Sequence, residues 1–242
     1  MESIKSSIKK AIYDAFPATF KLFLAQEIVN RHNYLRFLTT SFSQEGEDII
    51  LSQLFYGRAN GFFVDVGAHH PIRYSNTYRF YLHGWRGINI DAMPGSMRAF
   101  NEIRPEDINV EAAVSDQNEV LTYAMFNAGG LNTLSTERAD ELAKQGVEPY
   151  RTVAIDTVKL QHILATHVPP GQPVDFMSLD VEGFELNVLK SNDWTTFRPT
   201  VVLVESLELI NKDDLVRFMS QQQYHLIAQT INNLYFKTAV TD

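Results

Sequence analysis

Five short apolar runs, separated by helical patterns, constrain this fold more than any other feature. The runs are the candidate strands 61–66, 87–91, 108–114, 174–180 and 200–205. Strands that alternate with helices build a parallel sheet with helices on both of its faces. The sequence therefore predicts an open α/β fold.

Acidic residues mark the ends of four of these runs: Asp65, Asp91, Asp180 and Glu205. In open α/β sheets, ligands bind outside the carboxyl ends of the strands. A single acid after a strand usually caps the next helix. Four acids at one edge favour a binding site there.

Two helices are predicted in the first half of the chain, over 43–55 and over 75–82, with Ser75 as the N-cap of the second. The buried side of the first helix is expected to consist of Ile49, Ile50, Leu54 and Phe55. Residues 121–147 contain a polar helix at 136–144, and we interpret them as an insertion or lid over the site. Two β-like stretches, 224–228 and 233–238, predict a closing hairpin.

The first 40 residues carry a net charge of +3, whereas the whole chain carries −8. Apolar residues recur there at helical spacing with lysines off that face, which predicts a basic amphipathic helix. Docking on its own domain or on a second subunit is the preferred interpretation, and peripheral contact with an anionic membrane is the alternative. We expect a helical appendage over 1–40 and one domain over 41–242.

Composition and motifs exclude several classes of protein. The chain has no cysteine, so disulfides, thiolate nucleophiles and cysteine-based metal sites are ruled out. The charge of −8 disfavours a nucleic-acid binder. No apolar run approaches the ~18 residues that span a bilayer, and the start lacks the apolar region of a signal peptide, so we expect a cytoplasmic protein. Motifs of P-loop NTPases, serine hydrolases and zinc peptidases are also missing.

The sharpest local signal is the stretch VDVGAHHP at 64–71, where a strand turns through Gly67. Glycine there lets the backbone approach a ligand closely. The G-x-G-x-x-G fingerprint is absent, which weakens the alternative of a nicotinamide-dependent oxidoreductase. Asp91, at the end of the next strand, can accept both hydroxyls of a ribose. Together these residues indicate a cofactor that contains a nucleoside.

Five separated blocks resemble the FkbM family of S-adenosylmethionine-dependent methyltransferases over roughly residues 41–207. The blocks are SQEGED (43–48), FFVDVGAHHP (62–71), SNT (75–77), GWRGINIDAMP (84–94) and SLDVEGFELNVL (178–189). The resemblance implies a class I methyltransferase fold with a seven-stranded, mostly parallel sheet. It also implies O-methylation of a glycan, sugar or related small molecule. The alternative is a non-catalytic binding module that keeps the fold.

The resemblance also implies a set of cofactor-binding residues. Those expected around the methionine and ribose portions are Asp65, Gly67, Ala68, His69, Asp91 and Ala92, with Gln44 and Asn76 at the methionine end. Those expected to face the adenine are Glu111, Ala112 and Ala113, with Ser115 and Asp116 over its edge.

Methyl transfer needs placement of the acceptor oxygen and removal of its proton. The candidate bases are Asp180, Glu182 and His70, although His70 precedes a proline and can have a purely conformational role. A carboxylate is a weak base unless its neighbours raise its pKa or a metal lowers that of the hydroxyl. By position, Asp180 and Glu205 can hold Mg²⁺, although the adjacent acid and amide that usually accompany such a site are missing after Glu205. The expected partners are a small-molecule or glycan acceptor and, as an open alternative, further copies of the chain in a homo-oligomer.

Overall fold

The structure is a computed structural model that describes residues 21–22, 38–207 and 212–239. Ser41–Asp242 forms one compact unit. The basic helix predicted within residues 1–40 falls almost entirely outside the described residues, so it stays a prediction. Within the described ranges, no helix is long and apolar enough to cross a membrane.

A seven-stranded sheet forms the centre of this unit, in the order β3-β2-β1-β7-β8-β10-β9. Its parallel strands are β1 (Phe62–Val66), β2 (Arg86–Asp91), β3 (Ile108–Glu111), β7 (Phe176–Leu179) and β8 (Val201–Glu205). The hairpin of β9 (Tyr224–Gln229) and β10 (Asn233–Thr238) adds two antiparallel strands, with β10 paired to β8. The predicted seven-stranded, mostly parallel sheet and the closing hairpin are confirmed.

The expected strand over 108–114 is in fact two strands. β3 ends at Glu111 in the large sheet, and β4 (Ala113–Val114) pairs instead with β6 (Arg151–Val158) in a three-stranded sheet. The backbone N–H of Ala112 still donates to the carbonyl of Asp91, at 3.0 Å. The chain therefore leaves the large sheet immediately beside the end of β2.

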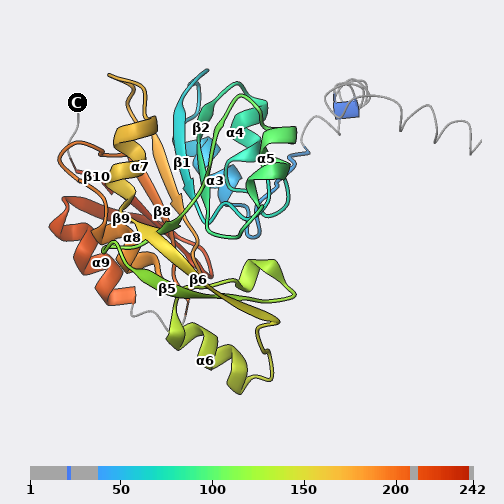
Figure 1. Cartoon of the computed structure of the whole chain (residues 1–242). Coiled ribbons are helices and arrows are strands. Elements are labelled where there is room, and N and C mark those ends of the chain that lie inside the picture. The colour runs from blue at the N-terminus through green and yellow to red at the C-terminus, as the bar shows by residue number, and fades with distance from the viewer. Residues whose placement is uncertain (1–20, 23–37, 208–211, 240–242) are drawn as a thin grey trace, which may run out of the picture. The chain divides into compact units, whose positions relative to one another are not determined.

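Helices cover both faces of the large sheet (Figure 1). One face carries α7 (Leu160–His167), α8 (Glu185–Lys190) and α9 (Lys212–Gln221), and the other carries α3 (Glu47–Leu54), α4 (Tyr78–Leu82) and α5 (Met97–Ile103). Side chains alternate between the faces along a strand. In β1, Val64 and Val66 therefore pack toward α7–α9, while Phe63 packs toward α3 and α4.

The buried side of α3 agrees with the prediction in part. Ile50 and Phe55 pack against the core, but Leu54 is 40% exposed. Leu51 and the two acids Glu47 and Asp48 are buried, which was not predicted. Hydrogen bonds explain this burial, because Asp48 accepts from the backbone N–H of Phe42 at 2.8 Å and Glu47 accepts from the side chain of Asn233 at 2.8 Å. Hydrophobic periodicity alone does not predict hydrogen-bond donors that come from other parts of the chain.

An arm, residues 120–158, extends from the sheet at the carboxyl ends of the parallel strands (Figure 1). It consists of β5 (Val120–Met125), the 3₁₀ turn η2 (Gly129–Leu131), α6 (Thr136–Lys144) and β6, with β5 and β6 paired antiparallel. The predicted helix over 136–144 is confirmed. Ser135 caps it by accepting from the backbone N–H of Arg138 at 3.1 Å. The two strands of the arm, β5 and β6, were not predicted.

Candidate active site

A cavity of about 720 Å³, including the part open to solvent, lies between the carboxyl ends of the central strands and the arm. The arm contributes Tyr123, Gly129 and Thr133 among its lining residues. Eight of the residues predicted from the sequence line it: Gln44, Gly67, His69, Asp91, Ala92, Ala112, Asp180 and Glu182. The structure therefore brings the ends of β1, β2 and β7 together around one space.

The turn after β1 requires glycine for two reasons. Gly67 has a φ of 81°, in the left-handed region, and a Cβ built on it would lie 1.7 Å from the carbonyl oxygen of Asp180. The turns that follow β1 and β7 therefore touch each other backbone to backbone. A side chain here would push apart the two walls of the cavity.

Asp91 ties the ends of β1 and β2 together. Its two carboxylate oxygens accept from the backbone N–H groups of His69 and Met93, each at 2.8 Å. The side chain is 7% exposed, and burial raises its pKa. Each oxygen has a second lone pair. Asp91 therefore keeps the capacity to accept from a ligand in the cavity.

Asp65 and Asn76 lie outside the cavity lining, contrary to the expectation that they contact the cofactor directly. Asp65 is buried and accepts from the hydroxyl of Thr77 at 2.7 Å. Burial raises its pKa to about 6. Asn76 donates to the hydroxyl of Ser178 at 3.0 Å and so joins the segment before α4 to β7. Both side chains support the wall of the cavity from behind.

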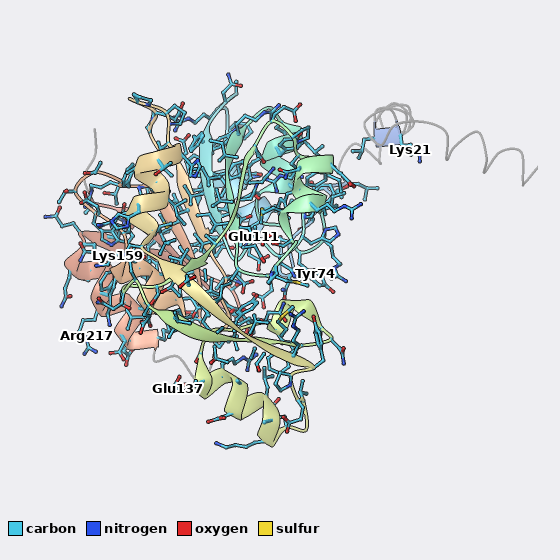
Figure 2. The ribbon with its side chains drawn as sticks, viewed as in Figure 1. Lys21, Tyr74, Glu111, Glu137, Lys159 and Arg217 are labelled. Atoms are coloured by element: carbon cyan, nitrogen blue, oxygen red, sulfur yellow. The ribbon has the colours of Figure 1, made fainter. Side chains whose placement is uncertain are left out.

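The predicted adenine contacts also differ from the structure. Ala112 lines the cavity, but Ala113 is buried in β4, and Glu111 is exposed and accepts from the backbone N–H of Gly95 at 2.7 Å (Figure 2). Ala68 packs against Met97 and Phe100. The alternation of side chains along the chain explains why only one residue of the expected trio faces inward.

Ser115 is fully buried, and Asp116 accepts from the side chain of Asn187 at 3.1 Å, so this pair joins the end of β4 to α8. Neither residue is among those that line the cavity.

His70 is misplaced for the role of general base. It does not line the cavity, and its Nδ1 accepts from the backbone N–H groups of Ile72 and Arg73, each at 3.0 Å. The ring therefore stabilises the turn before α4. His69 does line the cavity, but the guanidinium of Arg73 lies 3.1 Å from its Nε2. Because a guanidinium only donates, this nitrogen is already occupied as an acceptor.

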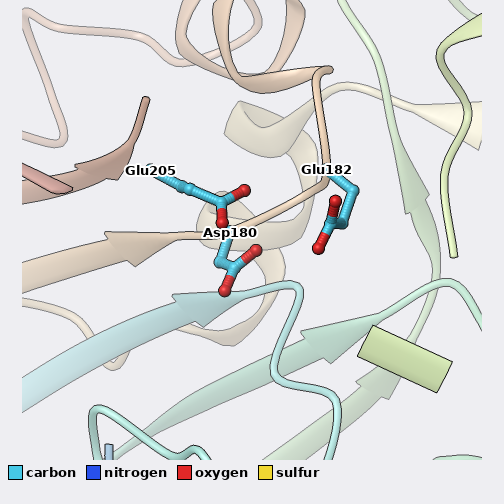
Figure 3. Close-up of side chains that lie close together, drawn as sticks. All are labelled: Asp180, Glu182 and Glu205. Atoms are coloured by element: carbon cyan, nitrogen blue, oxygen red, sulfur yellow. The ribbon is translucent and has the colours of Figure 1, made fainter. Parts of the chain in front are cut away.

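Three acids form a carboxylate cluster: Asp180 after β7, Glu182 in the next turn, and Glu205 at the end of β8 (Figure 3). One oxygen from each lies within 4.8 Å of the others. Burial and the neighbouring acids raise the pKa of Asp180 and of Glu205. Asp180 and Glu182 line the cavity, whereas Glu205 lies behind them.

Glu182 is held by the arm. Its Oε2 accepts from Nε and Nη2 of Arg138, at 3.1 and 3.0 Å, and its carbonyl accepts from the hydroxyl of Thr133 at 2.7 Å. Glu185 holds the same turn from the other side, since its Oε1 accepts from the backbone N–H groups of Val181 and Gly183, each at 3.1 Å. Burial raises the pKa of Glu185 to about 7.

Sequence reasoning missed two residues that shape this site, Arg138 and Tyr74. Arg138 lies in the first turn of α6, and nothing local in the sequence indicates that it reaches Glu182. Tyr74, which is labelled in Figure 2, lines the cavity. It is 53% exposed and has a φ of 59°. Nothing local in the sequence indicates this position for Tyr74. The helix that follows it begins at Tyr78 with Thr77, and not the predicted Ser75, as the N-cap.

One family model matches the chain. The Methyltransferase FkbM domain matches residues 65–226. No curated protein matches the chain significantly in sequence. A solved methyltransferase FkbM from Methylobacillus flagellatus KT is 12% identical with a TM-score of 0.48, and the match covers 81% of this chain and 48% of that one. The chain therefore spans about half the length of that protein.

Two further solved structures are similar at comparable levels. The C-terminal domain of precorrin-6Y C5,15-methyltransferase from Rhodobacter capsulatus is 10% identical, with a TM-score of 0.43 and coverage of 83% of this chain and 91% of that one. The precorrin-6Y C5,15-methyltransferase from Geobacter metallireducens is 14% identical, with a TM-score of 0.43 and coverage of 83% and 93%.

Proposed function

The chain belongs to the Methyltransferase FkbM domain family, and from that premise we propose that it transfers a methyl group from S-adenosylmethionine to a hydroxyl of a sugar, glycan or related small molecule. The observation that carries this proposal is the position of Asp91 in the cavity beside the Gly67 turn. A buried carboxylate next to closely packed backbone suits the ribose of a nucleoside.

The donor set of the cavity fits S-adenosylmethionine. Asp91 would accept from the ribose hydroxyls, and the small side chains of Ala92 and Ala112 would leave room for the adenine. Gly129 and Gly130 of the arm form the opposite side, where a Cβ on Gly129 would lie 3.3 Å from the ring of His69. Larger residues at these positions would fill the space that a nucleoside needs.

When bound, S-adenosylmethionine would supply an electrophilic methyl carbon to the acceptor oxygen, and the electron pair of the broken carbon–sulfur bond would remain on sulfur. The hydroxyl proton then needs a base. Asp180 is our candidate, because it lines the cavity and its raised pKa makes it a stronger base than an ordinary carboxylate. Glu182 is fixed by Arg138, which suits it to orient the acceptor.

The side chains at the cavity mouth are suited to bind a polar acceptor. Tyr74 presents a half-exposed ring there, with the guanidinium of Arg73 lying 5.2 Å from the ring centre. An aromatic face beside a cationic group suits a sugar that carries a charged substituent, such as a nucleotide sugar.

Calorimetry with S-adenosylhomocysteine tests the cofactor assignment. We expect one site per chain and a loss of affinity of about 30-fold or more in Asp91→Ala, because two charge-assisted hydrogen bonds disappear. The control is Glu111→Ala, an exposed acid at the end of the neighbouring strand, which should change affinity less than about threefold. Binding of NADH without any binding of S-adenosylhomocysteine would instead support an oxidoreductase.

Radiolabelled methyl transfer from S-adenosylmethionine to a panel of sugars and nucleotide sugars tests the reaction itself. Label in an ether linkage is expected. Label on a carboxylate or amine, with none on a hydroxyl, would overturn the proposed O-methylation.

A further inference from the structure

The carboxylate cluster carries more negative charge than the surrounding side chains balance. Asp180, Glu182 and Glu205 lie together, and the fully buried Glu185 lies one turn away. Within the described part of the chain, the ion pair at this cluster is the one between Arg138 and Glu182. Burying several carboxylates with a single positive partner is unfavourable unless protons or cations compensate them.

The cluster also contains a buried carboxylate oxygen that lacks a hydrogen-bond donor. Glu205 is 8% exposed, and its Oε2 has no hydrogen-bond partner. Its side chain points toward the carboxylate of Asp180 (Figure 3). An unpaired buried polar atom is costly, and the atoms around this one are themselves carboxylate oxygens. Either a proton shared with Asp180 or a bound cation would satisfy it.

The spacing suits a divalent cation. Oxygens bound to one cation at about 2.0–2.6 Å lie at most about 4–5 Å apart. The three carboxylates offer oxygens within 4.8 Å of one another, so a shared cation needs little rearrangement. Asp180 and Glu205 follow paired residues of neighbouring parallel strands, Leu179 and Val204, so the sheet fixes their separation.

We propose that Asp180, Glu182 and Glu205 together bind one divalent cation of the Mg²⁺ or Mn²⁺ type at the wall of the cavity. Oxygen ligands favour these hard ions. Glu182 is the ligand that sequence analysis did not assign to a metal, and it joins the cation to the arm because its Oε2 also binds Arg138. Each carboxylate has two oxygens, so Asp180 can hold the cation through one oxygen and accept a hydrogen bond from a ligand in the cavity through the other.

The role of this cation rests on the proposed function, although its binding does not. A cation beside an acceptor hydroxyl lowers the pKa of that hydroxyl and favours its loss of a proton. The cluster lies at the cavity wall, where such an acceptor would have to sit.

The test is a titration of the full chain, freed of metal by chelation, with Mn²⁺ followed by electron paramagnetic resonance. We expect one saturable site, which Mg²⁺ displaces. Asp180→Asn, Glu182→Gln and Glu205→Gln should each weaken it at least about tenfold. Glu148→Gln removes an exposed acid of the arm and is the matched control, with an expected change below about twofold.

Thermal melts of each variant show which are folded, and three independent ligand variants keep the test valid if one is not. The absence of a saturable site, or a site that Glu205→Gln leaves unchanged, overturns the proposal. Calorimetry with S-adenosylhomocysteine on the same samples separates the two claims. Cofactor binding without Mn²⁺ binding would contradict the proposed cation site alone. Mn²⁺ binding without cofactor binding would support the cation site and contradict the proposed function.

Discussion

Two groups of buried acids lie in this sheet, and their hydrogen bonding differs. On the face of α4 and α5, Arg104 is fully buried and binds Asp107 through Nε at 2.8 Å and Nη2 at 2.7 Å. The same guanidinium donates to the hydroxyl of Thr77 at 3.0 Å, and Thr77 in turn donates to Asp65. In the carboxylate cluster, by contrast, Glu182 is the one of the three acids that pairs with an arginine. That arginine, Arg138, is shared with Glu141 outside the cluster, and Glu205 retains an unpaired oxygen.

The difference distinguishes structural acids from acids of the candidate site. Acids whose oxygens are hydrogen-bonded by other residues of the chain hold strands and turns in place. Acids left unsatisfied at a cavity retain the capacity to bind a cation or to accept a proton. The account therefore predicts that variants of the first group lose stability, and that variants of the second group lose activity.

The largest expected effect is on catalysis. Asp180→Asn should lower kcat by about 10²–10⁴-fold, because the proton acceptor is removed, while affinity for S-adenosylhomocysteine stays within about threefold. Steady-state kinetics and calorimetry measure the two quantities. The contrasting variant is Asp107→Asn, which should lose about 3 kcal/mol of stability or more by leaving Arg104 unpaired, with unchanged cofactor affinity in the folded fraction. Equal losses of activity in both variants would contradict the distinction between structural acids and acids of the candidate site.

The contact between the turns after β1 and β7 comes next. Gly67→Ala should lower the free energy of unfolding by about 3 kcal/mol or more, since it combines a positive φ with a clash against a backbone oxygen. Urea denaturation measures the loss. Gly130→Ala is the control in the same cavity, because a Cβ there meets nothing within 4 Å and the backbone conformation is ordinary. A tolerated Gly67→Ala would show that the two walls are free to separate.

The buried acids also predict a pH dependence of stability. Burial raises the pKa of Asp65 to about 6, above its usual 3.8, so the folded chain binds this proton more tightly than the unfolded chain. The stabilisation is complete below pH 3.8 and is lost as the pH rises through about 6, a change of about 3 kcal/mol. Urea denaturation between these limits should show a smaller decline in Asp65→Asn. The exposed control Asp140→Asn should keep the full decline, and equal declines in both variants would contradict the assignment.

The smallest expected effect concerns the arm. Arg138→Gln removes the ion pairs of Arg138 with Glu182 and Glu141 and should cost about 1–2 kcal/mol, with faster hydrogen exchange in α6. The side chains of Arg138 and Glu182 are 14% and 12% exposed, so that pair is largely protected from solvent. The comparison variant is Arg98→Gln, whose pair with Glu102 is 86% and 68% exposed and should contribute less than about 0.5 kcal/mol. Exchange in α6 that is unchanged by Arg138→Gln would argue that other contacts hold the arm.

Much of the fold was predictable, because parallel strands leave a strong pattern. The runs that became β1, β7 and β8 are mostly apolar, as buried parallel strands need to be, and β2 has Ile88 and Ile90 in alternation with polar residues. The break between β3 and β4 was not predictable, since residues 108–114 read as one continuous strand. Only the pairing of Ala113 and Val114 with β6, more than forty residues later in the chain, shows where the strand divides.

The site was predictable in part, and the limit was the direction of side chains. The sequence pointed to the strand ends, and Gly67, Asp91, Asp180 and Glu182 do line the cavity. It could not show that Asp65 faces α4. Nor could it show that the ring of His70 is occupied by the backbone of its own turn. Arg138 reaches Glu182 from 44 residues away, a contact that only the folded arm creates.

The most direct test is a crystal structure of the chain with S-adenosylhomocysteine and Mn²⁺, with the anomalous signal of manganese recorded. It tests whether Asp91 binds the cofactor while the carboxylate cluster binds the cation. The account predicts the ribose on Asp91, the sulfur beside the Gly67 turn, and manganese among Asp180, Glu182 and Glu205. A nucleoside bound away from Asp91, or manganese bound to other acids while this cluster stays unliganded, would contradict it.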